Sequence, residues 1–111
     1  MPAFPFSRFE VQGPSMLPSF SEGERVLALS LQPPEIQEML RKLMPLHFAE
    51  PKGGDVVVLE KNGEKMVKRV SLDLRDGTYL VHGDNSSEST DSRAFGSVKR
   101  SEILGRVMFK Y

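Results

Sequence analysis

The sequence contains neither cysteine nor tryptophan, and only two histidines, His47 and His82, which lie far apart. Without cysteine, neither a disulfide framework nor a thiolate metal site can form. Neither histidine has a second His or a Cys at the spacing of metal ligands. The missing cysteines exclude disulfide scaffolds, and the missing ligand clusters exclude the common zinc domains. We therefore expect no metal and no cofactor.

A net charge of one sign is also absent, because 15 Lys and Arg residues balance 15 Asp and Glu residues over 111 residues. Nucleic-acid binding requires a basic excess on some face, so we expect no nucleic-acid partner. No window approaches the roughly 20 apolar residues of a membrane span, and residues 1–9 lack the basic and apolar parts of a signal peptide.

These absences predict one soluble domain over residues 1–111, since this length supports a single core. The expected location is the cytoplasm if the chain is full length. If an anchor has been removed, we expect a membrane-associated protein or one on the exported face. The sequence also leaves peripheral contact with a membrane as an alternative.

Alternating and β-branched residues predict a mainly β fold. The expected strands are residues 9–11, 24–30, 55–60, 65–71, 78–82 and 103–111. The run 55–60 is typical of a strand buried on both faces. Apolar residues at helical spacing between prolines predict one short helical insert at about residues 34–45. We interpret this insert as packing one face on the sheet. It contains too few basic residues to favour the alternative, a face that contacts a membrane or a partner.

The pair Asn62-Gly63 between two strands is a strong signal for a two-residue hairpin turn. Counting outward from that turn puts Lys61 opposite Glu64 and Val57 opposite Lys68. Lys68 then has apolar residues around it, and desolvation disfavours its ammonium form. We expect the pKa of Lys68 to fall from about 10.4 toward the value that a general base needs. The alternative is a lysine whose head reaches water past its apolar neighbours.

Ser15 lies in the segment Gly-Pro-Ser-Met-Leu-Pro, residues 13–18. A serine there can be an ordinary turn residue. The functional interpretation is that Gly13 and the two prolines hold an open, rigid loop that exposes the Ser15 hydroxyl. The backbone N–H of Ser15 could then stabilise an oxyanion. A serine combined with a lysine in apolar surroundings favours nucleophilic catalysis with lysine as the base.

Four segments of the sequence have the order and spacing of the motifs of a known protein family. They are residues 13–18, 51–58, 67–70 and 83–96. From about residue 11 to residue 107 the sequence resembles the signal peptidase I-like serine proteases, which share a β-fold with LexA-like domains. The resemblance implies that Ser15 is the nucleophile and Lys68 the general base. It further implies that Ser89 helps to orient the lysine, that Asp91 and Arg93 form a supporting pair, and that Gly83, Asp84 and Asn85 shape a loop.

Gly13 occupies the position at which some family members place a serine that completes the oxyanion hole. In size and layout the chain is similar to soluble minimal members, such as the nickel superoxide dismutase maturation proteases. The resemblance implies a serine endopeptidase that removes an N-terminal leader or signal peptide from a precursor protein through an acyl-enzyme. Its substrate would be a precursor protein or peptide bound in an extended conformation.

Two alternatives come from other functional classes. A LexA-like self-cleaving domain needs a cleavage segment before the serine, and the 14 residues before Ser15 contain no Ala-Gly step. A catalytically idle peptide-binding module would use the same groove without cutting, and the presence of Ser15, Lys68 and Ser89 argues against it.

Overall fold

The computed structural model describes residues 6–32, 34–43, 50–85 and 95–111, and the fold is mainly β, as the sequence predicts. Its elements in chain order are β1 (Phe6–Glu10), β2 (Arg25–Ser30), α1 (Pro34–Leu43), β3 (Val56–Lys61), β4 (Glu64–Asp73), β5 (Thr78–His82), β6 (Val98–Lys99), a 3₁₀ turn (Arg100–Glu102) and β7 (Ile103–Lys110).

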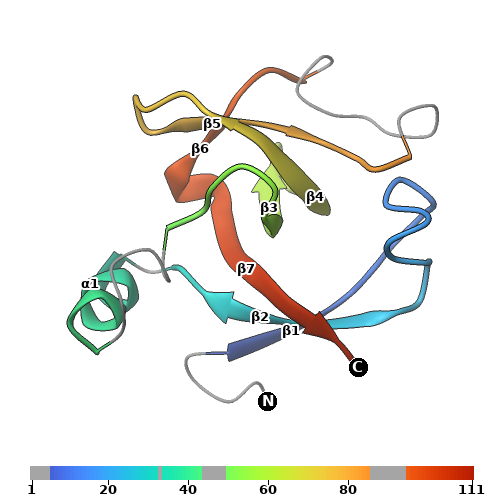
Figure 1. Cartoon of the computed structure of the whole chain (residues 1–111), viewed down its shortest axis with the longest axis horizontal. Coiled ribbons are helices and arrows are strands. Elements are labelled where there is room, and N and C mark those ends of the chain that lie inside the picture. Colours follow the sequence, from blue (N-terminus) through green and yellow to red (C-terminus); the bar gives the residue numbers. More distant parts are fainter. Residues whose placement is uncertain (1–5, 33, 44–49, 86–94) are drawn as a thin grey trace.

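The strands form one seven-stranded sheet in the order β1-β2-β7-β3-β4-β5-β6, and all neighbouring strands are antiparallel. The last strand, β7, therefore lies between β2 and β3 and joins the first part of the chain to the hairpin that follows (Figure 1). Figure 1 also shows the loop after β1 beside the segment that follows β5. These two segments lie beside the candidate site, to which β4 contributes Lys68.

The β3–β4 hairpin has the turn and the register that the sequence predicts. Asn62 and Gly63 both have positive φ, +55° and +80°, as a two-residue hairpin turn of this kind requires. Lys61 pairs with Glu64, and Val57 pairs with Lys68. The predicted position of the lysine in the hairpin is therefore confirmed.

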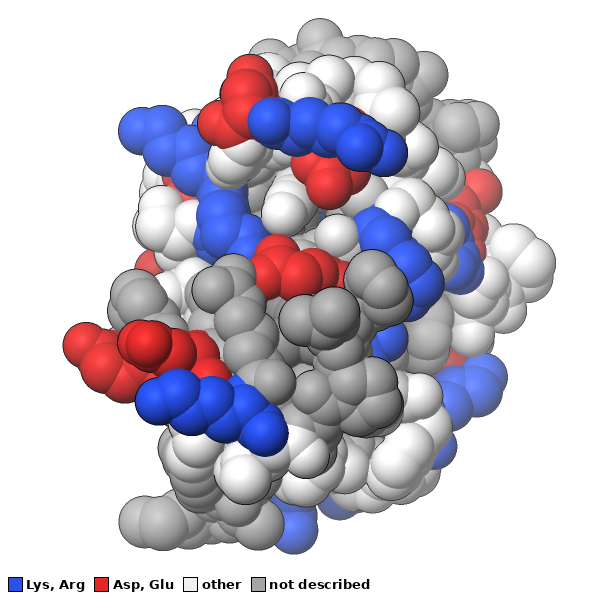
Figure 2. All heavy atoms as spheres, turned by 60° about the vertical axis from the view of Figure 1, so that its left-hand side comes forward, with Lys and Arg blue, Asp and Glu red and all other residues white. Residues whose placement is uncertain are grey.

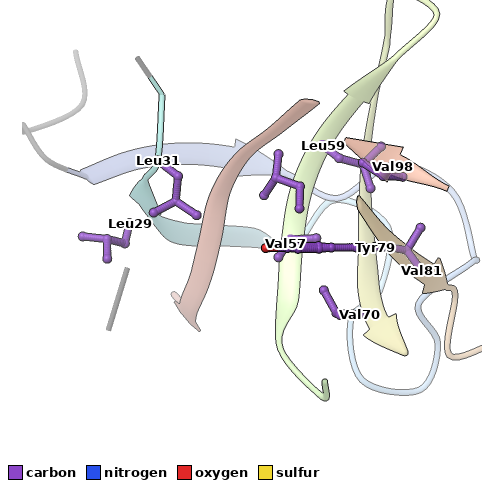
Figure 3. Packing of buried hydrophobic residues seen from close by; sticks show 9 residues of the cluster. Leu29, Leu31, Val57, Leu59, Val70, Tyr79, Val81 and Val98 are labelled. Atoms are coloured by element: carbon purple, nitrogen blue, oxygen red, sulfur yellow. The ribbon is translucent and has the colours of Figure 1, made fainter. Parts of the chain in front are cut away.

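Most residues of the buried core come from β3, β4, β5 and β6. The first four residues of β3 are all buried, as predicted for a strand covered on both faces. Figure 3 shows side chains from β3, β4, β5 and β6 gathered in this region. The buried cluster consists of Leu29, Leu31, Val57, Leu59, Val70, Tyr79, Val81, Val98 and Ile103.

The predicted helix is confirmed as α1, Pro34–Leu43, and residues 44–49 lie outside the described part of the chain. Met39 packs against the core, whereas Glu35, Glu38 and Lys42 are exposed. Leu43, which the helical spacing puts on the same apolar face as Met39, is 71% exposed, so the expected packing of this face on the sheet holds for Met39 alone among the described side chains. On the molecular face seen in Figure 2, Lys and Arg side chains lie close to Asp and Glu side chains, in line with the balanced composition.

Some boundaries differ from the sequence prediction. The first strand covers Phe6–Glu10 rather than residues 9–11, and β4 is longer than predicted. Val11 lies beyond β1, although its N–H still donates to the carbonyl of Glu24 at 2.8 Å. The sequence did not predict β6 or the 3₁₀ turn, because a two-residue strand is too short to show an alternating pattern.

Candidate active site

Ser15 lies, half-buried, in the loop that joins β1 to β2. Gly13 has φ +74°, a backbone conformation that favours glycine. Its N–H donates a hydrogen bond to Glu22 Oε1 at 3.0 Å. Met16, directly after the serine, is fully buried. The loop is therefore held on both sides of Ser15.

Lys68 lies in the middle of β4 and is the one buried polar or charged residue within the described ranges. It is 4% exposed, and its cross-strand partner Val57 and its near neighbour Val70 are buried as well. Burial of a lysine disfavours its charged form. The hairpin thus places a buried lysine beside apolar side chains, as hairpin counting predicts.

Ser15 and Lys68 line the same cleft, whose volume is about 700 Å³. One wall contains Arg8, Phe9 and Glu10 of β1, and another contains residues 64–68 of β4. Segments that are far apart in the sequence thus supply a hydroxyl and a buried amine to one open site. Gly13, Pro14 and Phe95 also line the cleft.

Asp84 connects three segments that surround the cleft. Its carboxylate accepts two hydrogen bonds from Arg69, from Nε at 2.9 Å and from Nη2 at 2.8 Å. It also accepts one from Ser19 Oγ at 2.6 Å, and Arg69 Nη1 donates to the carbonyl of Gly54 at 2.8 Å. The loop that carries Ser15 and the strand that carries Lys68 are thus joined through one carboxylate.

The charges of this pair reinforce each other. The guanidinium of Arg69 is the main cause of the lowered pKa of Asp84, with a further contribution from the Ser19 hydroxyl. Asp84 in turn raises the pKa of Arg69. A bidentate pair between guanidinium and carboxylate fixes direction as well as distance. Both groups are therefore charged at neutral pH and hold the two segments in a defined orientation.

Asn85 makes two further contacts with the loop that carries Ser15. Its backbone N–H donates to the carbonyl of Ser15 at 2.8 Å. Its side-chain Nδ2 donates to the carbonyl of Pro14 at 3.1 Å. The loop after β5 thus binds the backbone on both sides of the Ser15 α-carbon.

The remaining predicted site residues, Ser89, Asp91 and Arg93, lie outside the described residues, as does His47. Gly83 is buried next to Asp84. The sequence did not predict the pairing of Arg69 with Asp84. An available signal was the presence of an Arg directly after the candidate base and an Asp in the candidate loop.

The described residues contain no cluster of three or more His, Cys, Asp or Glu side chains that could hold a metal ion. No helix among the residues described has the length and apolar character needed to cross a membrane.

Comparison with known proteins adds matches over part of the chain. The family model described as signal peptidase, peptidase S26, matches residues 71–111. Signal peptidase IB from Staphylococcus aureus strain Mu50 is 51% identical over 35 residues, which are 32% of this chain and 18% of that protein. The same protein from strains N315 and MW2 matches with the same figures. The matched part thus spans about a fifth of the length of these relatives.

Proposed function

We propose that the chain is a serine endopeptidase with a Ser15–Lys68 dyad, and the similarity of its C-terminal part to signal peptidases supports this proposal. The observation that carries the proposal is the single cleft lined by Ser15 and by Lys68, whose side chain is 4% exposed. A lysine removed from water favours its neutral amine, which is the form that accepts a proton.

The proposed reaction proceeds through an acyl-enzyme. Neutral Lys68 takes the proton from Ser15 Oγ as the oxygen attacks the scissile carbonyl carbon. The backbone N–H of Ser15 donates a hydrogen bond to the oxyanion. The protonated lysine then gives its proton to the leaving amine as the C–N bond breaks. A water molecule, deprotonated by Lys68, hydrolyses the ester and restores the serine.

The cleft suits a peptide in an extended conformation. β1 pairs with β2 alone among the described strands, and the pairing of β4 with β5 begins at Arg69, after the cleft-lining residues 64–68. Both walls therefore offer strand edges to which a peptide can add backbone hydrogen bonds. We propose that the substrate is the N-terminal leader or signal segment of a precursor protein. The Asp84–Arg69 pair would support the site without touching the substrate.

Variants of the two dyad residues test this proposal. In Ser15→Ala and Lys68→Ala proteins, we expect peptide cleavage and reaction with a serine-directed acylating probe to fall by at least about 100-fold, the lower range for loss of a general base. Lys52→Ala is the matched control, because this lysine is 60% exposed and lies outside the cleft lining. Circular dichroism and thermal melts verify folding of each variant.

Full reactivity of the Lys68→Ala protein at neutral pH would sink the dyad. A wild-type protein that binds an extended peptide but neither cleaves it nor reacts with the probe would instead be the idle binding module.

A further inference from the structure

The orientation of one peptide group decides whether Ser15 can stabilise an oxyanion. The N–H of Ser15 belongs to the same planar unit as the carbonyl of Pro14. In a trans peptide the C=O and the N–H point in opposite directions. Whatever holds the Pro14 oxygen therefore also sets the direction of the Ser15 N–H.

Two donors hold the Pro14 oxygen. The N–H of Leu17 lies 3.1 Å from it, within the same turn. The side-chain Nδ2 of Asn85 also lies 3.1 Å from it and approaches from a residue 71 positions away in the chain. The local turn fixes the loop's curvature, and Asn85 adds a reference point outside the loop.

Asn85 itself is held in place by its surroundings. Its own N–H is bonded to the Ser15 carbonyl at 2.8 Å. The preceding residue, Asp84, accepts two hydrogen bonds from Arg69, at 2.9 and 2.8 Å. The amide group that contacts Pro14 thus extends from a backbone fixed on both the nucleophile loop and β4.

We propose that Asn85 is a positioning residue that orients the oxyanion-stabilising N–H of Ser15 through the Pro14 carbonyl. This inference rests on the proposed peptidase function and deepens it, because it assigns a role that loop shaping alone does not include. Asn85 touches neither the substrate nor the reacting atoms. It acts by preventing rotation of the Pro14–Ser15 peptide, so that the N–H is preorganised before the oxyanion forms.

Asn85→Leu is the informative variant, because leucine approximates the shape of asparagine but supplies no donor and adds no charge. The hydrogen bond from the Asn85 main chain to Ser15 does not depend on the side chain, so the two loops stay joined. We expect kcat to fall by about 10- to 100-fold, less than the loss of a whole oxyanion donor. KM should change by less than about twofold, since the N–H acts in the transition state.

Ser19→Ala is the matched control, because it removes a hydrogen bond between the same two loops without touching the Pro14–Ser15 peptide. The distinguishing readout is inhibition by a peptide aldehyde, which forms a tetrahedral adduct, relative to the corresponding peptide alcohol, which does not. The preference for the aldehyde should fall by about 10-fold or more in Asn85→Leu. In Ser19→Ala it should match the wild type.

Equal losses of aldehyde preference in both variants would overturn the positioning role and leave a merely structural loop contact. An Asn85→Leu protein with wild-type kcat would overturn it as well. If the wild-type protein itself fails to react with the acylating probe, the peptidase function is wrong. In that case crystal structures of the wild type and of Asn85→Leu test whether Asn85 orients the Pro14–Ser15 peptide. An unchanged peptide orientation in the variant refutes the positioning role, and a rotated peptide supports it.

Discussion

At the scale of single residues, the candidate site combines contacts of two kinds, and only one kind is readable from the sequence. The burial of Lys68 follows from local rules, because the Asn62-Gly63 turn sets the hairpin register and the register sets its neighbours. The pairing of Arg69 with Asp84 depends on how the loop after β5 returns to β4. No turn rule specifies that path, so composition and spacing left Arg69 without a role.

The Asp84–Arg69 pair predicts how stability changes with pH. The folded-state pKa of Asp84 is lowered, mainly by Arg69. The stabilisation is therefore fully present above the unfolded-state pKa of about 3.9 and is lost as the pH falls through the lower folded-state value. Asp84→Asn should cost about 1.5–3 kcal/mol at pH 7, the range for hydrogen bonds to charged groups. The cost should shrink as the pH falls below about 4, because the unfolded state gains the proton first and the native carboxylate gains it only at its lower pKa.

Urea denaturation of both proteins at pH 7 and at pH 3 measures this difference. Asp55→Asn is a suitable control, since the partner of Asp55 is Lys52, which is 60% exposed, and such surface pairs contribute about 0–1 kcal/mol. A stability difference between wild type and Asp84→Asn that is the same at both pH values would show that the pair is not the cause.

At the scale of elements, the local pieces were predictable and their order in the sheet was not. Each main strand and the helix follow from periodicity and turn residues, with shifts of a few residues at the ends. The insertion of β7 between β2 and β3 joins segments separated by most of the chain. No pattern within a single strand specifies such a neighbour. The requirement for a glycine at position 105 can be recognised only once both neighbours of β7 are known.

Gly105 lies where the backbones of β7 and β2 approach closely. A Cβ atom added there would lie 2.9 Å from the carbonyl oxygen of Leu29 and 3.1 Å from the Cβ of Ala28. Because backbone cannot yield as a flexible side chain does, Gly105→Ala should destabilise the protein by about 1–3 kcal/mol, the usual range for overpacking. Gly53→Ala is the control, since its added Cβ would lie 3.8 Å from the nearest atom, an ordinary contact. Equal denaturation midpoints for the two variants would contradict the close approach.

At the scale of the whole molecule, the sheet brings two strands that are not neighbours to one cleft. Three strands lie between β1 and β4 in the sheet order, yet residues of both line the cleft with Ser15 and Lys68. The sequence supplied the candidate nucleophile and base, whereas the walls that would hold a substrate emerged only from the three-dimensional arrangement.

If an extended peptide adds to these walls, its binding should leave a defined pattern in amide hydrogen exchange. In the Ser15→Ala protein, which cannot acylate, a bound peptide should protect residues 64–68 of β4 and residues 6–10 of β1. At a peptide concentration of 100 times its Kd, exchange that requires dissociation should slow by up to about 100-fold. The strand β6 at the other end of the sheet is the internal control, because it lies outside the cleft lining. Protection of β6, or none on β4 at saturation, would mean that the peptide binds elsewhere and that the cleft is not the substrate groove.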